Sequence, residues 1–126
     1  MLSKLLLLAL AGALGTISRY ALAGLVQEAG GASFPWGTLA VNLAGCFLAG
    51  LLWTLFETHW PLSGRIRMIL LVGFMGAFTT FSAFILETGE LARASEWGWA
   101  ALNLALQNVL GLAALFAGAA LARLVL

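Results

Sequence analysis

Long apolar stretches separated by short polar links dominate the pattern of this chain. Crossing the hydrocarbon core of a bilayer takes about 20 apolar residues in a helix. Stretches of this kind cover residues 5–26, 36–56, 68–86 and 97–122. Because backbone groups cannot stay unpaired in lipid, the pattern predicts an all-α membrane protein, with four transmembrane helices forming a single domain over residues 1–126.

The first ten residues, MLSKLLLLAL, allow a second interpretation. Lys4 followed by a leucine run is also typical of the start of a secretory signal peptide. However, the apolar stretch continues to Val26, and three further stretches follow it. We therefore expect a first transmembrane helix, and a cleaved signal peptide is the alternative.

Composition and charge narrow the class further. Of the 126 residues, 63% are hydrophobic and 9% are charged. The basic residues are scattered along the chain, so we expect no nucleic-acid partner. The single cysteine, Cys46, cannot form an intrachain disulfide and receives no role. The tryptophans expected to anchor helix ends at the headgroup level are Trp36, Trp60, Trp97 and Trp99.

An even number of spans places both termini on the same side of the membrane. The positive-inside rule favours cytoplasmic termini, but the excess of basic residues on that side is small. Insertion in both orientations therefore remains open. The terminal side would carry Lys4, Arg65, Arg67 and Arg123, and the other side Arg93 with Arg19.

Small residues recur at four-residue spacing in every span. Such positions let helix backbones approach closely. Since four helices cannot enclose a wide aqueous path, we expect close packing with a second copy, and hence a homodimer. The residues concerned are Ala11, Gly12, Gly15, Thr16, Gly45, Ala49, Gly73, Ala77, Ala114, Gly118 and Ala122.

Polar side chains inside the spans are the most informative positions, because burying them in lipid is costly. Arg19, in GALGTISRY, is either structural, with its side chain reaching the interface, or functional. Thr38 and Asn42, in GTLAVNLAG, share one helix face. They either bond to a neighbouring helix or line a pore. Asn103 and Gln107 repeat this spacing on the fourth span.

The third span contains an unusual segment, GFMGAFTTFSAF, at residues 73–84. The hydroxyls of Thr79, Thr80 and Ser82 could satisfy backbone groups that are released where a helix opens. We therefore predict a third helix broken near its centre, with backbone groups available to an ion. The alternative is a packing helix whose hydroxyls bond to their own carbonyls.

Four phenylalanines of the third span fall at intervals of four, three and three residues. Such a stripe is usually packing, but the positive ring edge can also stabilise an anion without a fixed charge. Together with the hydroxyls and amides, these edges suit a small anion. The stripe consists of Phe74, Phe78, Phe81 and Phe84.

The motifs GALGTISRY, GTLAVNLAG and GFMGAFTTFSAF, in this order and spacing, resemble those of the small fluoride channels called Fluc or CrcB. The resemblance covers essentially the whole chain. It implies an antiparallel homodimer that inserts in both orientations into the cell inner membrane. It also implies two fluoride pathways that export fluoride passively and confer fluoride resistance.

The resemblance further implies roles for individual residues. A structural Na+ ion would bind the backbone carbonyls of Gly76 and Thr79 at the dimer centre. Arg19 remains either a vestibule or a structural residue, and Phe74 and Phe78 remain packing. In the fourth span the family commonly has a tyrosine and a hydroxyl residue, whereas this chain has amides, which can also donate to fluoride. The implied fluoride-pathway residues are Thr38, Asn42, Thr80, Phe81, Ser82, Phe84, Asn103 and Gln107.

Two other functions remain open from the residues alone. A small proton-coupled exporter would need a titratable carboxylate inside a span. We expect none, because all titratable acids and His59 fall in or beside the predicted loops. A non-transporting structural subunit would use the polar residues only as helix contacts. No enzyme is expected, since the chain lacks a nucleophile with a base or a metal-ligand cluster. The acids are Glu28, Glu57, Glu87, Glu90 and Glu96.

Overall fold

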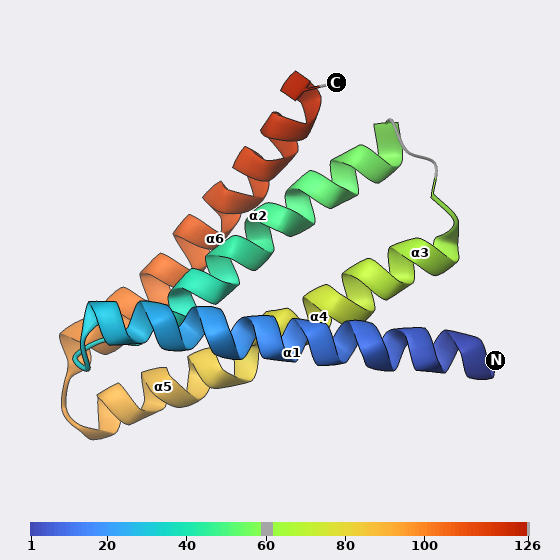
Figure 1. Ribbon diagram of the computed structural model, residues 1–126. Coiled ribbons are helices and arrows are strands. Elements are labelled where there is room, and N and C mark those ends of the chain that lie inside the picture. Colours follow the sequence, from blue (N-terminus) through green and yellow to red (C-terminus); the bar gives the residue numbers. More distant parts are fainter. Residues whose placement is uncertain (59–61, 126) are drawn as a thin grey trace.

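The computed structural model describes residues 1–58 and 62–125, and four long helical segments run through them (Figure 1). All four are long and apolar enough to cross a membrane, which confirms the four predicted spans. Each segment extends a few residues beyond its predicted apolar stretch. Trp60 and His59 lie outside the described residues. The elements are α1 Leu2–Gly30, α2 Trp36–Thr58, α3 Gly64–Met68, the π-helix η1 Ile69–Met75, α4 Gly76–Phe78, α5 Phe81–Arg93 and α6 Trp97–Val125.

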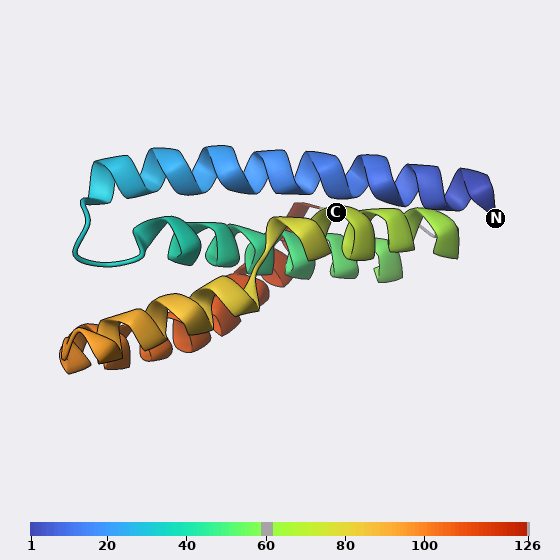
Figure 2. The same ribbon diagram turned by 90° about the horizontal axis from the view of Figure 1, so that it is seen from below.

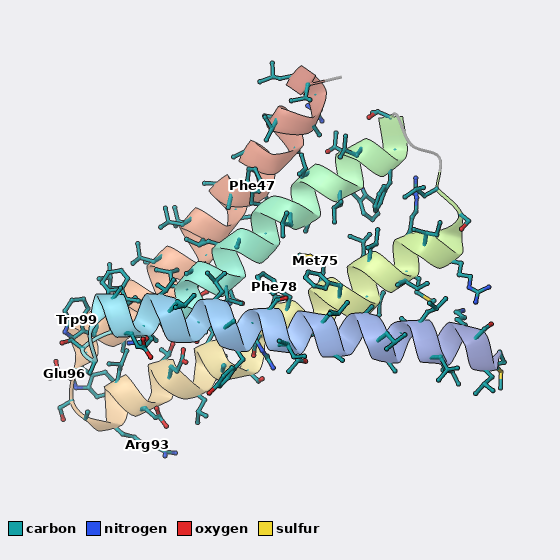
Figure 3. All side chains as sticks on the ribbon, in the orientation of Figure 1. Phe47, Met75, Phe78, Arg93, Glu96 and Trp99 are labelled. Carbon is teal, nitrogen blue, oxygen red and sulfur yellow. The ribbon has the colours of Figure 1, made fainter. Side chains whose placement is uncertain are left out.

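Helices α2 and α6 form the most extensive contact of the bundle and run side by side (Figure 1). Glycines make this approach possible. A Cβ atom on Gly118 would lie 2.0 Å from the carbonyl oxygen of Phe47, and one on Gly50 would lie 2.0 Å from that of Leu115. The two backbones therefore touch without intervening side chains, and Phe47 is labelled beside this contact in Figure 3.

The small residues of the first three spans also pack inside the subunit. A Cβ atom on Gly15 would lie 2.3 Å from the carbonyl oxygen of Phe74, and one on Gly45 would lie 2.0 Å from Cγ2 of Thr79. The predicted close packing at these glycines is confirmed, but its partners are helices of the same chain. These glycines therefore do not by themselves support a homodimer.

The helical run that begins at Gly64 stops at Phe78 and resumes at Phe81. Thr79 and Thr80 between them have extended backbone conformations, with φ and ψ of −88° and 159° and of −149° and 113°. The chain changes direction at this point (Figure 2). As a result, η1 and α4 pack against α1, whereas α5 packs against α6.

The turn between α1 and α2 is held by one side chain, that of Gln27. Its Nε2 atom donates to the carbonyl oxygens of Gly31 at 2.6 Å and Phe34 at 2.9 Å. Its Oε1 atom accepts from the backbone N–H of Gly37 at 3.0 Å. Phe34, which is buried, packs its ring against Trp36 at a centroid distance of 4.6 Å. These contacts fix where α2 begins.

Replacing Gln27 by Met is expected to lower the free energy of unfolding by about 1–3 kcal/mol. Methionine keeps the length of the side chain but removes all three hydrogen bonds, which leaves part-buried backbone groups unpaired. Denaturant or thermal unfolding in detergent measures the change. The exposed neighbour Glu28 is the control, and Glu28→Gln should shift stability by less than about 0.5 kcal/mol. Equal stability of the two variants would contradict the prediction.

Candidate functional site

The side chain of Asn42 holds the interruption of the third span open. Its Oδ1 atom accepts from the backbone N–H of Thr80 at 2.9 Å, and its Nδ2 atom donates to the carbonyl oxygen of Thr80 at 3.1 Å. The Asn42 amide thus bonds both the N–H and the carbonyl of Thr80, in place of the partners that a continuous helix would provide. Nδ2 also donates to Oε1 of Gln107 on α6, at 3.0 Å. One side chain of α2 therefore joins the interruption to α6.

This arrangement releases backbone carbonyls near the interruption, among them those of Gly76 and Thr79. In an uninterrupted α-helix, the N–H of Thr80 would donate to the carbonyl of Gly76, and the N–H of Ala83 to that of Thr79. Here the first donates to Asn42, and the second donates to Oγ1 of Thr80 at 3.2 Å. The carbonyls of Gly76 and Thr79 therefore lose their usual partners. A carbonyl oxygen freed in this way is a suitable ligand for a hard cation.

A hollow of about 380 Å³ lies beside the interruption. Gln107 contributes a side-chain nitrogen, Nε2, which is buried and has no hydrogen-bond partner among the described residues. Its Oε1 atom is held by Asn42, so Nε2 is an unused donor of a residue that lines this hollow. The other lining residues come from α2, η1, α4, α5 and α6 and from the interruption itself, and include Gly45, Cys46, Leu71, Met75, Gly76, Thr79, Thr80, Phe81, Phe84 and Asn108.

Two phenylalanines of the stripe, Phe81 and Phe84, reach this hollow. Their rings meet edge to face, with centroids 5.6 Å apart and planes inclined by 68°. Phe84 is 4% exposed and Phe81 is 75% exposed. Phe74 and Phe78, in contrast, stack on one another at 5.7 Å and are not among the residues that line the hollow. The stripe thus divides into a pair at the hollow and a pair that packs within the protein.

A larger hollow, of about 780 Å³, lies on the other side of the interruption, between α1, α2 and α5. Arg19 and Thr38 both line it, so the structure brings these two predicted residues together. Thr80 lines both hollows. The two spaces therefore approach each other at the residue that Asn42 holds.

Glu87 corrects one prediction from the sequence. We expected this acid in or beside a loop, but it lies within α5, inside the candidate span Gly64–Arg93. It is half-buried in the larger hollow, and its Oε1 atom accepts from Oγ1 of Thr38 at 2.6 Å. One signal in the sequence could have predicted this position. Glu87 follows Thr80 by seven residues, or two helical turns, so a helix that begins at the interruption would place both on the same face. Because Glu87 lies within a span, a proton-coupled exporter can no longer be excluded on the ground that the spans contain no titratable carboxylate.

Two predicted pathway residues line neither hollow, Asn103 and Ser82. Asn103 is fully buried, and its Nδ2 atom donates to Oγ1 of Thr88 at 2.9 Å. Its unpaired atom is the oxygen Oδ1, which would repel an anion. Ser82 is exposed, with Oγ 3.3 Å from Oγ1 of Thr80. Although Asn103 and Gln107 are four residues apart on α6, only Gln107 therefore lines the smaller hollow.

Metal ligation by side chains finds no support in the part of the chain that the structure describes. Residues 1–58 and 62–125 contain no group of three or more histidine, cysteine, aspartate or glutamate side chains placed to hold an ion.

The fold and the site define a small multi-pass membrane protein in which polar groups gather at an interruption of its third span. The chain belongs to the family described as “CrcB-like protein, Camphor Resistance (CrcB)”, which matches residues 6–119. The family resemblance of the motifs is thereby confirmed.

Relatives cover the chain almost completely. A protein of Desulforapulum autotrophicum named “Fluoride-specific ion channel FluC” is 62% identical over 122 residues, which are 97% of this chain and 98% of the relative. Proteins with the same name from Nitrosococcus oceani and Solidesulfovibrio magneticus are 54% and 53% identical over 125 residues, which are 99% of this chain and 100% of each relative. These relatives are named as channels, in agreement with the prediction that the chain is not an enzyme.

Proposed function

We propose that this protein is a fluoride channel that lets fluoride leave the cytoplasm passively across the inner membrane, and so confers fluoride resistance. The observation that carries this proposal is the smaller hollow, which is lined by Phe81, Phe84 and Gln107, and Gln107 has an unused Nε2 donor. The names of the close relatives support fluoride as the ion.

The chemistry of the hollow suits an anion that must exchange its water for weak ligands. Fluoride binds water tightly, so donors along a path must compensate for dehydration and still release the ion. Amide N–H groups and ring edges carry partial charges and meet both requirements. Arg19 lines the larger hollow and not the smaller one, so its positive charge can attract fluoride without trapping it in the narrow part.

The proposal includes an antiparallel homodimer with two pores. Phe81 is 75% exposed although it lines the smaller hollow, so one chain leaves that hollow incomplete. A second copy could cover it. The number of basic residues differs little between the two membrane faces of the chain, which is compatible with copies in opposite orientations.

A structural Na+ ion is part of the same proposal. The carbonyls of Gly76 and Thr79 have lost their helical partners, and no atom of another element lies within 4 Å of the Cβ position at Gly76. These two oxygens fit a hard cation, but two ligands are too few to replace its water. A symmetric second copy would double the set. The ion would neutralise carbonyl dipoles where two interruptions meet.

The test is fluoride efflux from liposomes that contain the purified protein, followed with a fluoride electrode. With a potassium gradient and valinomycin to balance charge, we expect fluoride to leave at least about a hundredfold faster than chloride, because partial charges at close range select the small ion. Protein-free liposomes are the control. Fluoride flux at the protein-free level would contradict the channel.

A proton-coupled exporter is the second candidate, and Glu87 is the observation that favours it. This carboxylate lies within a span, and its Oε2 atom is buried without a partner among the described residues. The same liposomes separate the two functions. A channel gives fluoride efflux without proton movement, whereas an exporter takes up protons as fluoride leaves, which a pH-sensitive dye inside the liposomes detects.

A further inference from the structure

A basic hollow lies at the end of the bundle where α1 and α3 begin, away from the interruption. Its volume is about 310 Å³, and it is lined by Met1, Ser3, Lys4, Gly64, Arg65 and Met68. The guanidinium of Arg65 donates from Nη2 to Oγ of Ser3 at 2.9 Å, which joins the first turn of α1 to the first turn of α3. Figure 1 shows these two helix starts at the same end of the molecule.

The hollow offers positive charge and hydrogen-bond donors. No acidic residue is among the described residues that line it. Arg65 has five N–H groups, of which the bond to Ser3 uses one, and the ammonium of Lys4 has three. Because the hydroxyl of Ser3 accepts from Arg65, its own proton remains available to a ligand. This set of donors matches the oxygens of a phosphate group.

The flanks of the hollow are apolar, which distinguishes a lipid from a free ion. Leu5, Leu6 and Ile66 are 55%, 56% and 42% exposed, and each follows a basic residue of the hollow by one or two positions. These residues belong to candidate spans and are exposed, so acyl chains can lie against their side chains. A ligand with a phosphate head and hydrocarbon tails therefore matches both parts of the surface.

We propose that the hollow formed by Ser3, Lys4 and Arg65 binds the phosphate of an anionic phospholipid, with the acyl chains along the exposed face of α1. Basic pockets between transmembrane helices at the headgroup level favour such lipids. In an antiparallel dimer each leaflet would contain one of these sites. The inference does not depend on which ion the protein conducts.

The experiment measures lipid retention by native mass spectrometry of the full chain in detergent. Phosphatidylglycerol and phosphatidylcholine with identical acyl chains are added in equal amounts. We expect the protein to retain phosphatidylglycerol preferentially, and the double variant Lys4→Gln/Arg65→Gln to lose about tenfold or more of that preference. Arg123→Gln is the matched control, because Arg123 is exposed and is expected on the same side of the membrane but does not line this hollow.

Two further arms make the result specific. The double variant Lys4→Arg/Arg65→Lys keeps both charges and should keep the preference, which separates loss of binding from loss of folding. Millimolar inorganic phosphate should not displace the lipid, because it lacks the apolar contacts. Retention of the preference in the Gln double variant, equal loss in Arg123→Gln, or displacement by free phosphate would each overturn the proposal. Since no ion flux is measured, failure here leaves the proposed channel function untouched.

Discussion

Replacing Asn42 by Ala is expected to reduce fluoride efflux at least about a hundredfold, a change of about 2.7 kcal/mol in the barrier. Asn42 bonds both backbone groups of Thr80, at 2.9 and 3.1 Å, and orients Gln107 at 3.0 Å. Without the amide, the N–H and carbonyl of Thr80 lose their partners, which costs about 1–3 kcal/mol for each buried group. Thr80 can recover a bond by donating to Gly76, which closes the interruption. The measurement is fluoride-electrode efflux from liposomes.

Asn108→Ala provides the matched control for this experiment. Asn108 is also an amide that lines the smaller hollow, but its Nδ2 atom donates to the carbonyl of Leu104 on its own helix, at 2.7 Å. Its loss should therefore leave efflux within about twofold of the wild-type rate, because it holds no other element in place. Wild-type efflux in Asn42→Ala, or equal losses in both variants, would show that the bonds to Thr80 do not maintain the pathway.

Replacing Phe84 or Phe81 by Ile is expected to lower fluoride efflux about tenfold or more in each single variant. Isoleucine keeps an apolar side chain but removes the positive ring edge that would stabilise the anion. The two variants should differ in stability. Phe84 is 4% exposed, so its substitution should also cost about 1–3 kcal/mol of unfolding free energy. Phe81 is 75% exposed in the single chain and should cost much less. Efflux and denaturant unfolding are measured on the same preparations.

Phe74→Ile is the control for the phenylalanine pair. Phe74 belongs to the same stripe but stacks on Phe78 and does not line the hollow. Its substitution should leave the efflux rate nearly unchanged while affecting packing. If Phe81→Ile and Phe84→Ile both conduct at the wild-type rate, the pair serves only packing.

Hydrophobic pattern alone predicted the four spans, because the length of an apolar helix is set by the thickness of the bilayer and not by its neighbours. Helix ends were less predictable. Glu87 and Glu90 look like loop residues by polarity, yet α5 continues through both to Arg93. A carboxylate can remain in a helix when a neighbouring helix supplies a donor, and Thr38 does so for Glu87. That partner lies 49 positions away in the chain.

The sequence by itself determined that this is a four-span membrane protein, since apolar length and unpaired polar groups are local properties. It also indicated Asn42 and Gln107 as one set with Thr38, Thr80, Ser82 and Asn103, to which the family resemblance added Phe81 and Phe84. Only the tertiary structure decided how the set is used. Asn42 and Thr80 are 38 positions apart, and Asn42 and Gln107 are 65 apart. Whether a polar side chain is hydrogen-bonded, unpaired or packed depends on partners that are distant in the chain. The spacing of residues along one helix cannot reveal these partners.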